Sequence, residues 1–248
     1  MSKIEKYFEH LSLSTINLFI RDKSKFCLKV SGLDDSFGNP AMLRGRAVEN
    51  QLLPLPIYKE RNIEELINDA DVFYKTESLE FDKSIEKEKI EKERLDVPKY
   101  IMSGFPFYYN LKDKGLITQK KITYNLSELN IPIIGFIDLE CINTIRDLKT
   151  TRAIPSVVPH MVQRQLAFYS YVSRKQAWVD YVSKKHCTTY RIDNVERTMN
   201  EIIVICLSIE KFLNISDDIK EIASMFPPNL DSWEWSEEDN INWKKLGV

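Results

Sequence analysis

The chain has 248 residues, of which 43% are hydrophobic and 29% are charged, a balance typical of a globular protein that buries a full core. Its formal net charge is -2, so the bulk electrostatics do not indicate a nucleic-acid partner and any phosphate-binding surface must be local. No run approaches the ~20 apolar residues that cross a bilayer, and charges occupy the N-terminal stretch where a signal peptide would be apolar. We therefore expect a cytoplasmic protein without a membrane partner.

The four cysteines, Cys27, Cys141, Cys187 and Cys206, lie far apart and include no CxxC pair. Neither a zinc ribbon nor a disulfide framework is indicated by this spacing. We interpret them as free thiols.

The first third of the chain shows two helix patterns. Ser12 or Ser14 is suited to cap a short helix within residues 15–26, where apolar side chains repeat at helical spacing. A second helix is predicted over residues 41–53, because Asn39 can cap it and a proline stands at its first turn.

Residues 62–96 are helical in pattern but increasingly charged, with Ile85, Ile90 and Leu95 as the only apolar anchors near the end. This favours a solvated helix of mixed charge, with a partner-binding arm as the alternative. Aromatic and β-branched content over residues 100–126 then predicts the start of a sheet.

The second half of the chain carries the clearest alternation. Two strands are expected within residues 131–140 and 144–150, followed by a helix over 160–175. Two further strands within residues 178–192 precede a long amphipathic helix over 194–213.

Side chains alternate across a strand, so Asp147 and Lys149 share one face while Leu148 points to the other. If the hairpin turns tightly at residues 142–143, Asp138 lies directly opposite Asp147, although Ile-Asn is not a preferred turn pair. Opposed residues have Cβ atoms about 4.5–5.5 Å apart. The two carboxylates could then share a cation.

Without a cation the two carboxylates would repel. Like charges ~4 Å apart cost about 4 kcal/mol at an effective dielectric constant of 20, and one lysine relieves only part of this. Oxygen ligands favour Mg²⁺ or Mn²⁺ over zinc. The alternative is that Asp138 pairs with a surface lysine and Asp147 with Lys149, and a DxK tripeptide taken alone favours that alternative.

Three segments in order resemble the RecB-type branch of the PD-(D/E)XK nucleases. Residues 135–151, GFIDLECINTIRDLKTT, resemble its GxxD, short hairpin and DxKT motif. Upstream, RGRAVE resembles its helix motif, with Glu49 at the position of the acid, and downstream QLAFY resembles its QxxxY helix, with Gln165 and Tyr169. The segments LSLSTINLF and FPPN near Phe226 also resemble this branch.

The resemblance implies an α/β protein with a restriction-endonuclease-like core, in which helices flank a central mixed sheet on both sides. We expect a single domain over residues 1–248, with a helical part at 1–97 and a catalytic core at 100–225. Iron-sulfur members of this branch have cysteines where this tail offers Trp233 and Trp235, so no iron-sulfur cluster is expected.

For the site, the resemblance implies that Asp138, Asp147 and the main-chain carbonyl of Leu148 hold one or two Mg²⁺ ions, for which Mn²⁺ can substitute. Glu49 would complete the site directly or through water. Lys149 would orient or deprotonate the attacking water and stabilise the transition state of phosphodiester hydrolysis.

DNA contacts are expected from Gln165 and Tyr169, which share a helix face. Cations and hydroxyls near the site are further candidates to bind phosphate: Arg44, Arg46, Thr150, Thr151 and Arg152. Each of these site residues also has a simpler interpretation. Glu49 could pair with Arg46, and Gln165 and Tyr169 could be ordinary residues of a packed helix. The charged side chains could be solvated. His160 is a lone histidine without a positioned partner and is left out of the site.

The preferred function is a DNA exonuclease of recombination, repair or phage DNA processing, because this branch is dominated by end-processing enzymes. An endonuclease is the runner-up. A catalytically silent DNA-binding subunit and an unrelated α/β protein with a coincidental DLKT are the alternatives from other classes. Homo-oligomerisation and an annealing-protein or helicase partner stay open.

Overall fold

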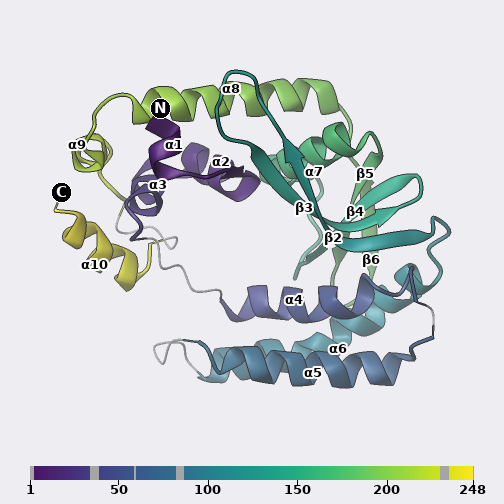
Figure 1. Ribbon diagram of the computed structural model, residues 1–248. Coiled ribbons are helices and arrows are strands. Elements are labelled where there is room, and N and C mark those ends of the chain that lie inside the picture. The colour runs from purple at the N-terminus through teal and green to yellow at the C-terminus, as the bar shows by residue number, and fades with distance from the viewer. Residues whose placement is uncertain (1–2, 34–38, 59, 82–86, 230–234, 248) are drawn as a thin grey trace. The chain divides into compact units, whose positions relative to one another are not determined.

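The computed structural model describes residues 3–33, 39–58, 60–81, 87–229 and 235–247. The chain is an α/β protein with an open, mixed central sheet and flanking helices (Figure 1). The described helices are α1 (Lys3–Tyr7), α2 (Leu13–Arg21), α3 (Lys23–Val30), α4 (Pro40–Leu52), α5 (Ile63–Ser78), α6 (Lys87–Tyr109), α7 (His160–Ser173), α8 (Val195–Leu213), α9 (Ile219–Ser224) and α10 (Glu237–Leu246). The strands are β1 (Leu11–Ser12), β2 (Gly115–Tyr124), β3 (Ile133–Cys141), β4 (Thr144–Thr150), β5 (Gln176–Val182) and β6 (Cys187–Arg191).

The sheet runs in the order β1, β3, β4, β5, β6, and β2 also pairs with β3. The β4–β5 pair is parallel, whereas the β3–β4 and β5–β6 pairs are antiparallel. A parallel pair needs a crossover connection, and α7 supplies it between β4 and β5.

The chain forms two compact units. Unit 1 comprises Met1–Ser36, Ile122–Gly135 and Glu196–Val248, and unit 2 comprises Phe37–Lys121 and Phe136–Val195.

Unit 1 has an aromatic centre. Phe19 of α2 and Phe26 of α3 both contact the ring of Phe212 in α8, with centroids 5.2 and 5.8 Å away. Phe226 lies 5.3 Å from Phe212 and its carbonyl accepts a hydrogen bond from Ser24. The LSLSTINLF and FPPN segments of the sequence therefore both contact Phe212 in this unit.

Unit 2 has helices on both faces of β4 and β5. Leu148 and Val182 point into the apolar core shared with α4 and α6. Asp147 points to the opposite face, where Gln165 of α7 donates a hydrogen bond to it. Figure 1 shows α7 on one side of these strands and α4 and α6 on the other.

Most predicted elements of regular structure are confirmed. Ser12 caps α2 by accepting from the Thr15 amide, and Asn39 caps α4 by accepting from the Met42 amide. The two strands of the central hairpin, the helix after them, the next two strands and the long helix α8 all form where alternation or periodicity placed them.

The prediction for residues 62–96 and 100–126 is partly wrong. The first range holds two helices, α5 and the start of α6, and α6 continues to Tyr109 through residues predicted to begin the sheet. Tyr100, Gly104 and Tyr108 are buried at helical spacing, so the burial pattern outweighs the strand preference of aromatic residues.

The charged stretch of α6 is not solvated throughout, because two of its acidic side chains are buried. Glu93 and Asp96 are 5% and 7% exposed, whereas the expected anchor Leu95 is 58% exposed. The buried face of this helix is therefore partly acidic. Ile85 and Trp233 lie outside the described residues.

All four cysteines of the sequence are described as free thiols, which confirms that expectation. Among the described residues, no helix combines the length and apolarity needed to cross a membrane.

Candidate active site

The β3–β4 hairpin confirms the predicted register. Leu139 pairs with Arg146 and Glu140 with Ile145, the register predicted for the residues next to the turn. The two strands are joined by two residues, as expected.

The unfavoured Ile-Asn turn is held by a residue that the sequence interpretation missed. The Asp113 carboxylate accepts hydrogen bonds from the Asn143 amide at 3.2 Å and from Thr144 Oγ1 at 2.7 Å. The Ile142 amide donates to the Lys114 carbonyl at 3.0 Å. Asp113 precedes the sheet in an irregular KDKG segment, where no local pattern indicates what it will bind.

Asp147 is the centre of the cluster and is completely buried. Lys149 Nζ forms an ion pair with Asp147 Oδ2 at 2.7 Å, and Gln165 Nε2 donates to Oδ1 at 3.3 Å. Lys149 is the one partner that the described residues give to Oδ2. Asp138 Oδ2 accepts from the Leu148 amide at 3.2 Å, so the hairpin backbone itself fixes the second carboxylate.

Helix α4 brings Glu49 to this cluster. Gly45 lets the helix approach β4, because a Cβ at this position would lie 3.3 Å from Thr150 Oγ1. Glu49 interacts electrostatically with Lys149 and Asp147. Arg46 pairs instead with Glu77 at 3.0 Å, so its expected alternative pairing with Glu49 is not the contact that forms.

The carboxylates oppose one another's ionisation. Burial, followed by the charge of Asp147, raises the pKa of Asp138 well above its ordinary value, against the effect of Lys149. Burial also raises the pKa of Glu49, Lys149 lowers it, and Asp147 raises it further. Burial alone would lower the pKa of Lys149, but the charges of Asp147 and Asp138 raise it above its ordinary range. The cluster therefore has more acidic groups than one lysine can keep ionised together.

These donors fit a hard divalent cation. All are oxygen atoms, and Asp138 and Asp147 have one lysine between them to balance their charge, a shortage that Mg²⁺ or Mn²⁺ would relieve. Within the described parts of the chain, no group of three or more His, Cys, Asp and Glu side chains lies close enough together to hold a metal ion. The fit therefore rests on the Asp138–Asp147 pair.

Gln165 links the cluster to Tyr169. Its Nε2 donates to the Tyr169 hydroxyl at 3.0 Å as well as to Asp147. Tyr169 is 5% exposed, and burial raises its pKa to about 12. These contacts suit a role in orienting the site from α7.

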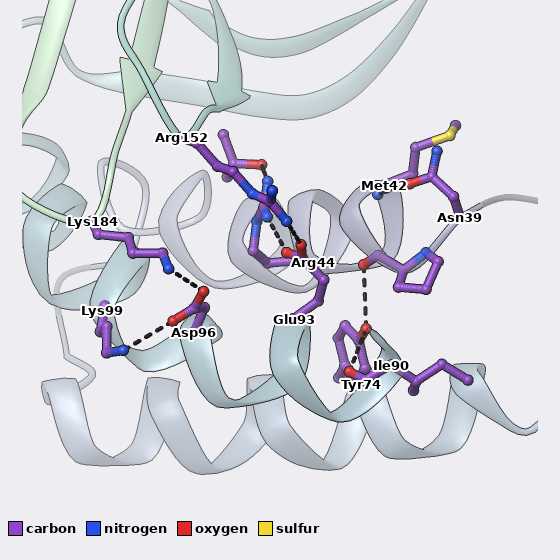
Figure 2. A network of polar contacts seen from close by, with 12 residues as sticks. Asn39, Met42, Arg44, Tyr74, Ile90, Glu93, Asp96, Lys99, Arg152 and Lys184 are labelled. Carbon is purple, nitrogen blue, oxygen red and sulfur yellow. Dashed lines mark hydrogen bonds and ion pairs between the residues drawn. The ribbon is translucent and has the colours of Figure 1, made fainter. Parts of the chain in front are cut away.

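Arg44 is buried, whereas the sequence suggested that it would contact phosphate at the surface. It is 4% exposed, stacks 4.5 Å above the Tyr100 ring and forms an ion pair with Glu93. Its Nη2 also donates to Thr150 Oγ1 at 3.4 Å. Figure 2 shows Arg44 and Arg152 converging on Glu93, so Arg44 ties α4, α6 and the end of β4 together.

Two of the expected cations do lie at the surface. The Arg46 side chain is 61% exposed and that of Arg152 is 67% exposed, each with one carboxylate partner. Arg152 is held by Glu93, a residue that the sequence placed on a solvated face. Thr151 Oγ1 donates to the Ala153 carbonyl at 2.7 Å and so shapes the loop that carries Arg152.

Comparison with known proteins adds little. No family model matches the chain, and no curated protein gives a significant match. A solved structure described as "Crystal structure of SSO0001" is similar with 16% sequence identity, a TM-score of 0.33, and coverage of 59% of this chain and 88% of that chain. A TM-score this low carries no argument, so the function must be inferred from the site itself.

Proposed function

We propose that the chain is a divalent-metal-dependent deoxyribonuclease with a restriction-endonuclease-like core of the PD-(D/E)XK type. One observation carries the proposal: Lys149 and Gln165 both contact Asp147, Asp138 lies on the neighbouring strand of the same hairpin, and Glu49 of α4 is within electrostatic range of them. These residues were predicted from separate segments of the sequence. If the DLKT motif were a coincidence, there would be no reason to expect the residues predicted from the other segments near it.

Asp138 and Asp147 would hold Mg²⁺ or Mn²⁺, with the Leu148 carbonyl and Glu49 completing the donor set. A divalent ion at such a site acidifies water and neutralises charge on a phosphate. The reaction class is phosphodiester hydrolysis.

The protein's own groups have distinct tasks in this reaction. Lys149 supplies a fixed positive charge and hydrogen-bond donors to the attacking water and the phosphate, since Asp147 holds its ammonium 2.7 Å away. Gln165 holds Asp147 from α7. A preorganised donor of this kind typically contributes a factor of about 10²–10³ to turnover.

DNA would be held chiefly at the active site. The chain has a net charge of -2, and Arg152 and Arg46 are the exposed cations among the predicted phosphate contacts. An enzyme that binds DNA only at its active site is suited to take up a free DNA end. We therefore propose that the protein is an exonuclease and that it acts in the cytoplasm. An endonuclease and a silent DNA-binding subunit are the competing outcomes of the test.

The test is a time course on end-labelled linear DNA and covalently closed circles, single- and double-stranded, with Mg²⁺, Mn²⁺, Ca²⁺ or excess chelator. We expect Mg²⁺ or Mn²⁺ to support degradation of linear DNA and chelator to stop it. Asp138→Asn, purified in parallel, must be inactive, because a contaminating nuclease would survive this change. Efficient nicking of closed circles would replace the exonuclease with an endonuclease. Binding without cleavage would favour the silent subunit.

A further inference from the structure

Tyr181 of β5 stands beside the catalytic lysine. In the parallel β4–β5 pair, Lys149 pairs with Tyr181 and Asp147 with Val179. Adjacent strands lie about 4.8 Å apart, and paired residues point to the same face of the sheet. Tyr181 therefore shares the face of Asp147 and Lys149.

The Tyr181 hydroxyl lacks a partner in the described structure. The residue is 5% exposed, and its oxygen is buried without a hydrogen bond. Neighbouring tyrosines are satisfied: the Tyr169 hydroxyl accepts from Gln165, and the Tyr190 hydroxyl donates to the Pro155 carbonyl at 2.9 Å. Buried polar groups are nearly always paired, so an unpaired hydroxyl at this place points to a ligand that completes it.

The surroundings of Tyr181 keep its hydroxyl protonated, so that it can donate a hydrogen bond. The Tyr181 ring contacts Tyr190 edge-on, with centroids 5.9 Å apart. Burial, followed by the charge of Asp147, raises the pKa of Tyr181 to about 12. The phenol therefore keeps its proton near neutral pH, and the pairing of Tyr181 with Lys149 places it beside the cluster.

We propose that Tyr181 is a further catalytic residue, whose hydroxyl donates a hydrogen bond to a non-bridging oxygen of the substrate phosphate beside Lys149. This inference rests on the proposed nuclease function and names one more contact of the same site. Negative charge builds on that oxygen as the bond to the attacking water forms, so the contact strengthens in the transition state.

The test compares Tyr181→Phe with Tyr100→Phe. Tyr100 of α6 is completely buried and also has an unpaired hydroxyl, so its variant removes the same atom away from the cluster. Four quantities are measured for each: kcat, KM, the Kd for Mn²⁺ by calorimetry, and the melting temperature. For Tyr181→Phe we expect kcat to fall about 10²-fold, with KM, Mn²⁺ affinity and melting temperature near those of the wild type. Tyr100→Phe should match the wild type in all four.

The outcomes separate the two proposals. If the wild type cleaves DNA and Tyr181→Phe cleaves equally fast, the role of Tyr181 is overturned and the nuclease stands. If Tyr181→Phe loses melting temperature or Mn²⁺ affinity together with turnover, the residue is structural and the proposed contact is wrong. If the wild type neither binds Mn²⁺ nor cleaves, the nuclease proposal fails, and the phosphate contact of Tyr181 fails with it.

Discussion

Two completely buried aspartates lie on neighbouring strands of unit 2 with opposite surroundings. Asp180 of β5 accepts hydrogen bonds from Arg146 Nε at 2.7 Å, from Arg146 Nη2 at 2.6 Å and from the Tyr108 hydroxyl at 3.0 Å. Asp147 of β4, on the other face of the sheet, has an ion pair with Lys149 and one long hydrogen bond from Gln165.

The comparison sets a fully paired acid against one that is only partly neutralised. Asp180 is held by a bidentate arginine and a phenol. Asp147 has the Lys149 ammonium on one oxygen and lies within electrostatic range of Asp138 and Glu49. One lysine relieves only part of the repulsion among three carboxylates, so we propose that a bound cation completes the site.

The largest effect is expected on stability when the two acids are neutralised in turn. Asp180→Asn leaves Arg146 buried without its charge partner and should lower the free energy of unfolding by about 3–5 kcal/mol. Asp147→Asn removes one charge partner of Lys149, but Lys149 keeps the charge of Asp138 and the repulsion between the two acids is lost, so stability should change by less than about 1 kcal/mol. Denaturant unfolding of both variants measures the difference. Equal destabilisation would mean that Asp147 is a structural residue too.

Lys149→Ala should lower turnover by about 10²–10³, because one preorganised cation is lost from the transition state. Lys120→Ala is the matched control, since Lys120 also pairs with a buried carboxylate, that of Glu140, at 2.7 Å. Steady-state rates on end-labelled DNA compare the two. A Lys149→Ala enzyme as fast as Lys120→Ala would make Lys149 an ordinary ion-pair partner.

Glu49→Gln should weaken Mn²⁺ binding by about 10–100-fold, the usual effect of removing a group that orients or supplements the ligands. Glu77→Gln is the control, because it removes a carboxylate that pairs with Arg46 of α4 and leaves the cluster intact. Calorimetry gives both affinities. Unchanged affinity in Glu49→Gln would remove this residue from the donor set.

The smallest effect is expected at the surface. Arg152→Ala should weaken DNA binding similarly across sequences and reduce the log–log salt slope by about one, as expected for one phosphate contact. Arg191→Ala is the control, since Arg191 is 57% exposed and also pairs with an aspartate. Binding is measured in Ca²⁺ over a salt series. Equal slopes for the two variants would exclude Arg152 from the DNA contact.

The sequence was sufficient for the features that depend on local rules. The two-residue spacing predicted the hairpin register at Leu139–Arg146 and Glu140–Ile145, and cap chemistry at Asn39 predicted the start of α4. Both depend on residues close to each other along the chain.

Features set by tertiary contacts were not predictable in this way. Glu93 is buried because Arg44 and Arg152 reach it from other segments, and a charged helix pattern contains no information about such partners. The place of Tyr181 beside Lys149 depends on the register of a parallel pair joined through α7, which no turn fixes. The aromatic end of α6 was mistaken for a strand because its packing against α4 outweighs intrinsic preference.

The central claim is that the Asp138–Asp147 pair binds a divalent cation, and calorimetric titration with Mn²⁺ tests it most directly. The wild type should bind Mn²⁺, Lys149→Ala should retain this binding, and Asp147→Asn should lose it. A wild-type protein that binds no Mn²⁺, or an Asp147→Asn variant that binds it as tightly as the wild type, would contradict the account.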